Sequence, residues 1–153
     1  MKDELDKALC EKYPLIFKDR QGDMKDTAMF WGFEHGDGWY QILDSLCGNI
    51  QSYIDWNNRS AVAGYKDFQP VEQVVAQQVK EKFGGLRFYY QGGDRHISGM
   101  VRMAESWASV TCEVCGAPGT IRHGGWIKTL CDAHHEEREE KRNAIMKQTG
   151  LED

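Results

Sequence analysis

Four residues near the end of the chain have the types and spacing of a metal-binding set. Cys112 and Cys115 are separated by two residues, and Cys131 and His134 repeat that spacing after fifteen intervening residues. Two such pairs of thiolate and imidazole donors are typical of tetrahedral structural zinc. Four protein ligands leave no position for water, so the spacing predicts one structural Zn²⁺ per chain and no catalytic metal. His135 is the alternative fourth ligand, and the two-residue gap favours His134.

The residues around these ligands predict the elements that hold them. Residues 119–122 and 126–130 are predicted to form two short strands around a turn at 123–125, and a helix is expected over 132–147. This order of elements resembles the treble-clef class of zinc finger over residues 112 to about 140: a tight turn with the first ligand pair, then a hairpin, then a helix with the second pair. The resemblance implies a zinc module with its second ligand pair at the start of the helix.

Two alternatives for this module involve nucleic acids. Treble clefs also underlie HNH nucleases, and His123, His135 and Asn143 are the local candidates for a second, catalytic metal, although the predicted hairpin is too short to house both sites. A nucleic-acid-binding zinc module is motivated by Arg122 and Lys128 on the hairpin. The net charge of −5 disfavours it, because nonspecific nucleic-acid binding depends on an excess of Lys and Arg.

The composition is that of an ordinary globular protein. Of 153 residues, 41% are hydrophobic and 28% charged, which predicts one domain, or one domain with a small appendage, and excludes wholesale disorder. No apolar run approaches the roughly 20 residues of a membrane span, and no signal peptide begins the chain, so we expect a cytoplasmic protein without a membrane partner. Cys10 and Cys47 lie among apolar helical positions and are expected to be small buried side chains.

The first part of the chain predicts two helices and a strand. A short charged helix is expected over 3–12 and an aromatic strand over 28–33. Asp37 is the predicted N-cap of a long helix, and residues 57–66 are expected to form a polar loop after it. The buried face of the long helix is predicted to carry Trp39, Ile42, Leu43, Leu46, Ile50, Tyr53 and Ile54.

The middle of the chain predicts two further helices around a strand. A helix is expected to begin at Pro70, to bury Val71, Val74, Val75 and Val79, and to end at Gly84. Alternating residues predict a strand over 86–90, and Asp94 is expected to cap the third core helix. The buried face of that helix is predicted to carry Ile97, Met100, Val101, Ala104 and Ala108.

Glycine pairs bracket the strand over 86–90 and suggest a ligand site. Backbone N–H groups at Gly92, Gly93 and the helix start, with Arg87 and Arg95 nearby, could hold an anion. Tyr89 could stack on a ring of the same ligand. The alternative is that the glycines only form turns and the aromatic side chains belong to the core.

The final helix is dominated by charge. It is expected to be either a solvated helix or an arm that contacts a partner. The predicted partner-binding residues are Arg138, Arg142, Ile145 and Met146.

Two motifs together are similar to a family of small tailed-bacteriophage proteins. They are the stretch 79–90, Val-Lys-Glu-Lys-Phe-Gly-Gly-Leu-Arg-Phe-Tyr-Tyr, and the finger over 111–134 with its Gly125-Trp126. The resemblance implies an accessory protein made in the cytoplasm of an infected bacterial host, with no assigned reaction. Its expected partner is a host or anti-phage defence protein, or a small nucleotide.

These patterns combine into one expected architecture. We predict an α+β fold in which a small antiparallel sheet packs with about three helices, followed by a treble-clef-like zinc module that ends in a charged helix. The core domain is expected over 1–110 and the module over 111–153. The leading functional hypothesis is a non-enzymatic, zinc-stabilised protein that inhibits its partner by binding it.

Overall fold

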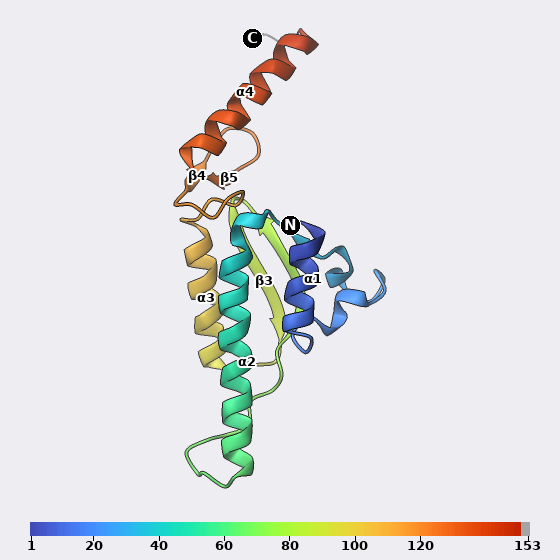
Figure 1. Cartoon of the computed structure of the whole chain (residues 1–153), viewed down its shortest axis with the longest axis vertical. Coiled ribbons are helices and arrows are strands. Elements are labelled where there is room, and N and C mark those ends of the chain that lie inside the picture. Colours follow the sequence, from blue (N-terminus) through green and yellow to red (C-terminus); the bar gives the residue numbers. More distant parts are fainter. Residues whose placement is uncertain (151–153) are drawn as a thin grey trace.

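A three-stranded sheet lies at the centre of the computed structural model, which describes residues 1–150 (Figure 1). The strand order is β1 (Phe33–Glu34), β2 (Val75–Lys82) and β3 (Gly85–Gln91). Strands β2 and β3 form an antiparallel hairpin in which Val79 faces Phe88, whereas β1 pairs with β2 in parallel. The predicted α+β class is confirmed, with a short parallel strand added to the antiparallel pair.

Four α-helices surround or follow this sheet. They are α1 (Asp3–Lys12), α2 (Tyr40–Val62), α3 (Arg95–Ala108) and α4 (Asp132–Thr149). Helix α3 packs against both α2 and β3, and α2 and α3 run side by side along the sheet (Figure 1). A second, two-stranded sheet of β4 (Thr120–Arg122) and β5 (Lys128–Leu130) lies between α3 and α4 in the chain. Helix α4 extends away from the rest of the molecule.

The predicted buried faces of α2 and α3 form most of the core. All the predicted inward residues of α2 and of the turn before it are buried except Tyr53, which is partly buried. On α3, four of the five are buried and Met100 is partly buried. The Asp94 carboxylate accepts a hydrogen bond from the backbone N–H of Ile97, 3.1 Å away, so this predicted cap is confirmed.

The helix predicted to begin at Pro70 is wrong, because residues 75–82 form strand β2. Its valines are β-branched and fit a pleated strand better than a helix. Val75, Ala76 and Val79 are all buried, since β2 is the central strand with neighbours on both sides. A strand buried in this way lacks clean alternation, so its pattern resembles one helical stripe.

Three other local predictions are also wrong. Residues 28–31 form a 3₁₀ turn rather than a strand, because Thr27 Oγ1 accepts the N–H of Met29 and offers the backbone a local alternative to a ladder. Helix α2 continues through much of the predicted loop, because Asn57 and Asn58 lie on its surface and hydrogen-bond to Tyr53 and Val71.

Asp37 does not cap the helix that follows it. Its carboxylate instead accepts the backbone N–H of Lys2 at 2.7 Å, at the N-terminus of α1. A negative charge there satisfies a free N–H group and complements the helix dipole. Asp37 therefore joins α1 to the loop before α2.

The two cysteines outside the metal-binding set have no sulfur partner. Cys47 is fully buried in the core, and Cys10 is partly buried beside Asp6. Burial and the neighbouring Asp6 carboxylate raise the pKa of Cys10 to about 12, so its thiol stays protonated and unreactive at neutral pH. Within residues 1–150 no helix has the length and apolar character needed to cross a membrane.

Candidate metal centre

Cys112, Cys115, Cys131 and His134 come together as one cluster. Their potential ligand atoms all lie within 4.8 Å of one another. The Sγ atoms of Cys115 and Cys131 are 3.9 Å apart, and His134 Nδ1 lies 3.2 Å from Cys131 Sγ. A tetrahedral zinc ion with Zn–S bonds of about 2.3 Å holds its sulfurs roughly 3.8 Å apart. The four residues could therefore hold a metal ion, and their spacing is compatible with zinc.

His134, rather than His135, belongs to this cluster. Cys131 is the N-cap of α4, so His134 lies in the first turn of that helix. The His135 backbone N–H donates to Cys131 O at 3.0 Å, and its buried Nδ1 has no hydrogen-bond partner within the described part of the chain. The start of α4 thus directs only one of the two histidines toward the sulfur atoms.

The first ligand pair lies on a tight turn. The backbone N–H of Gly116 donates to Cys112 O at 2.9 Å, and Gly116 has a φ of 79°, which favours glycine. Burial opposes ionisation of Cys112, yet backbone N–H groups of Cys131, Cys115 and Val114 lower the pKa of its thiol to about 7. The turn therefore favours the thiolate form, which is the form that binds a metal.

The loop before α2 packs against the tight turn that holds Cys112 and Cys115. The sequence patterns do not reveal this contact. The N–H of Gly38 donates to Glu113 O at 2.8 Å, and the fully buried Trp39 donates its indole N–H to Thr111 O at 2.9 Å. A Cβ at Gly38 would lie only 2.1 Å from Cys112 O, so the close approach requires glycine. The Gly36-Asp37-Gly38 segment therefore supports the metal-binding loop from below.

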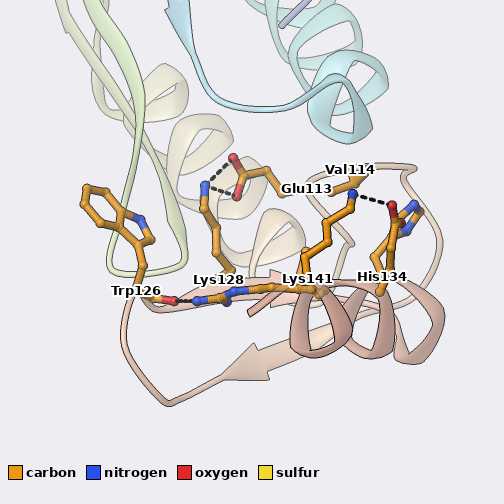
Figure 2. A pocket seen from close by; sticks show the side chains of 9 residues that line it. Glu113, Val114, Trp126, Lys128, His134 and Lys141 are labelled. Carbon is orange, nitrogen blue, oxygen red and sulfur yellow. Dashed lines mark hydrogen bonds and ion pairs between the residues drawn. The ribbon is translucent and has the colours of Figure 1, made fainter. Parts of the chain in front are cut away.

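A buried ion-pair network also joins the module to the sheet. Lys128 Nζ lies 2.9 Å from both carboxylate oxygens of Glu113 (Figure 2). It also lies 3.4 Å from Glu81 Oε2. The side chains of Glu113 and Glu81 are only 6% and 5% exposed. The backbone N–H of Gly84 and the indole N–H of Trp126 also donate to Glu81. The two carboxylates thus share one cation, and each also accepts hydrogen bonds, as buried charges require.

His35 lies buried under the same loop in its neutral form. Its Nδ1–H donates to Gly36 O at 2.8 Å, and its buried Nε2 has no partner within residues 1–150. Burial is the main reason that the pKa of His35 falls from 6.5 to about 4. A proton on Nε2 would have no acceptor, so the folded state resists protonation.

We expect acid to destabilise the protein through His35. The unfolded chain takes up this proton near pH 6.5 and the folded chain only near pH 4, so the stability conferred by neutral His35 is lost as the pH falls through this window. The loss should reach about 2 kcal/mol between pH 7 and pH 5. Denaturant unfolding of wild type and His35→Asn at both pH values measures it. Acid can also release the metal, but it does so in both proteins, so the difference between their pH dependences reports His35. Equal pH dependence of stability in the two proteins would contradict the prediction.

The residues predicted to form a ligand site beside β3 are spread along it. Arg87 donates to its neighbour Leu86 O at 3.0 Å, and Tyr89 is exposed with the Lys80 ammonium 5.8 Å from its ring centre. Gly93 donates its N–H to Glu72 O, so this group is already occupied. Gly92 has a positive φ, and Arg95 begins α3. Ligand binding by these residues stays a prediction.

The predicted partner-binding residues line up along α4. Arg138 donates to Trp126 O, and Arg142 pairs with Glu139 at 2.9 Å. Ile145 is 60% exposed and Met146 is partly buried. The first turns of α4 therefore contact the hairpin, and its later turns present charged and apolar side chains to solvent.

The residues that motivated the two nucleic-acid alternatives either form ion pairs within the chain or lie outside the metal-binding cluster. Arg122 pairs with Asp132, and Lys128 pairs with Glu113. His123 and Asn143 are exposed. In the part of the chain that the structure describes, the one cluster of at least three metal-binding side chains contains neither His123 nor His135.

No protein-family model, curated protein or solved structure matches this chain.

Proposed function

We propose that this chain is a zinc-stabilised, non-enzymatic binding protein, an accessory protein of a tailed bacteriophage that acts in the cytoplasm of the infected host. It blocks a bacterial host or anti-phage defence component, either a protein or a nucleotide signal. The three-thiolate, one-imidazole donor set supports the structural role of the metal, because such an ion has no coordination position left for a substrate. The resemblance of the stretch 79–90 and the finger over 111–134 to small tailed-bacteriophage proteins is the support for this context.

The exposure of helix α4 is the observation that supports a binding role. It is 18 residues long, none of its described side chains is buried, and it extends away from the rest of the molecule (Figure 1). Because few of its side chains are even partly buried, packing against its own chain stabilises α4 only a little. Its surface is free to pack against another molecule, which fits a recognition arm better than a structural element.

The test is capture followed by titration. Tagged, zinc-loaded protein is exposed to bacterial lysate, and retained proteins and small molecules are identified by mass spectrometry. Ile145→Ser is compared with Val62→Ser, an equally simple change at a residue that is 90% exposed at the far end of α2. Loss of a protein partner only with Ile145→Ser would place that partner on α4.

Stoichiometry separates a binding protein from an enzyme. We expect the activity or free concentration of the captured component to fall until about one chain is present per partner. Conversion of an excess of partner by a small fraction of chains would contradict the proposal, and so would reproducible retention of no component.

A further inference from the structure

A cavity opens between the metal-binding loop, the hairpin and α4 (Figure 2). Its volume is about 580 Å³, within the range of small-molecule sites. Val114, Trp126 and Leu130 supply apolar surface, and Lys128, Arg138 and Lys141 supply positive charge. Two carboxylates also line the cavity, Glu113 paired with Lys128 and Glu137 paired with Lys141. The cavity therefore combines a flat aromatic side chain with cations, and none of the residues assigned from the sequence to a ligand site belongs to it.

Trp126 is held in place although it is exposed. The side chain is 71% accessible, and its indole N–H donates to the buried Glu81 carboxylate at 3.1 Å. Lys128 and the N–H of Gly84 hold that carboxylate in turn. An exposed tryptophan costs free energy in water, and one with an anchored ring offers a ready platform for stacking.

Two of the three cations are available to a ligand. Lys128 is held by two buried carboxylates. Among residues 1–150, Lys141 pairs with Glu137 alone, and the two side chains are 71% and 53% exposed. Such a pair exchanges readily, because surface ion pairs contribute little stability. Arg138 donates one N–H to Trp126 O and keeps others for an anion. Arg138 and Lys141 are three residues apart and so share one face of α4.

We propose that this cavity binds a nucleotide, with the base stacked on Trp126 and the phosphate held by Arg138 and Lys141. An aromatic ring joined to an anion matches the platform and the cations together. Acidic residues on the same helix, Glu136, Glu139 and Glu140, would repel a long polyanion more than a single nucleotide. The inference rests on the proposed binding function and names a ligand class for it.

Calorimetry on the zinc-loaded full chain tests the site with AMP and GMP as probes. We expect saturable binding of at least one of them, and affinity at least about tenfold lower for the matching nucleoside, which lacks the phosphate. Trp126→Leu should lower the affinity about tenfold or more, the range of base–aromatic stacking, and Trp126→Tyr should retain most of it. Arg138→Gln should also weaken binding about tenfold.

Matched controls and a second ligand make the result decisive. Trp56→Leu and Arg102→Gln change exposed residues on α2 and α3 and should bind like wild type. One zinc per chain in each variant shows that the module is folded. A ten-nucleotide single strand that binds more tightly than the mononucleotides, and depends on Trp126, would place the recognised nucleotide within a strand.

Failure of this site differs from failure of the binding function. No saturable binding of AMP, GMP or the single strand would overturn the nucleotide site, and so would unchanged binding by Trp126→Leu. If a host protein is still retained in the lysate experiment, the proposed binding function stands without this site. If neither a nucleotide nor a protein binds, both proposals fail.

Discussion

Removal of the metal is expected to unfold residues 111–150 and to leave the sheet with α1 to α3 folded. Between Ala108 and residue 150 no residue belongs to the main hydrophobic cluster, and α4 has no buried side chain within its described length. We therefore expect a bound metal to take the place of a hydrophobic core in this part of the chain. In zinc-finger peptides such binding is worth roughly 10 kcal/mol or more at neutral pH. Circular dichroism before and after chelation should show loss of a helical signal equivalent to α4.

Ligand substitution should reproduce the effect of chelation. Cys115→Ser is expected to abolish the uptake of one zinc per chain and to lower the helical signal. Cys10→Ser removes a partly buried thiol outside the cluster and serves as the matched control, with zinc content unchanged. A chelated chain that keeps its full helical signal would show that the metal is not what folds the module.

Lys128→Ala is expected to destabilise the protein by about 3–5 kcal/mol at neutral pH. The substitution leaves the carboxylates of Glu113 and Glu81 close together and without their cation, although both are almost fully buried. The cost arises from the uncompensated charges rather than from lost attraction alone. Denaturant unfolding of the zinc-loaded protein measures the free-energy change.

Lys141→Ala provides the matched control for Lys128→Ala. It removes a lysine from an exposed pair with Glu137, and the expected loss is below about 1 kcal/mol. Lys128→Met, with Glu113→Gln and Glu81→Gln, removes all three charges and should recover part of the stability. Equal destabilisation by the two single alanine substitutions would contradict a special role for the buried network.

The parts of the fold that are local in sequence could be predicted from it. The buried faces of α2 and α3 follow the three- and four-residue spacing of apolar side chains, and Asp94 caps α3 through a contact only three residues away. The metal-binding set follows from two short spacings, because each ligand pair lies on a single turn. These features depend on near neighbours, so residue type and spacing are sufficient to find them.

Long-range contacts were decided by the tertiary structure alone. Strand β2 is paired on both edges, by β1 and β3, and the spacing of its apolar residues on its own is compatible with either a helix or a buried strand. Gly38 packs against Cys112, which is more than seventy residues away in the sequence. Lys128 pairs with Glu81, which is almost fifty residues away. Trp126 likewise becomes an anchored surface residue only when Glu81 lies beneath it. Such pairs leave no periodic trace in the sequence, because packing and charge pairing act between segments whose separation along the chain is arbitrary.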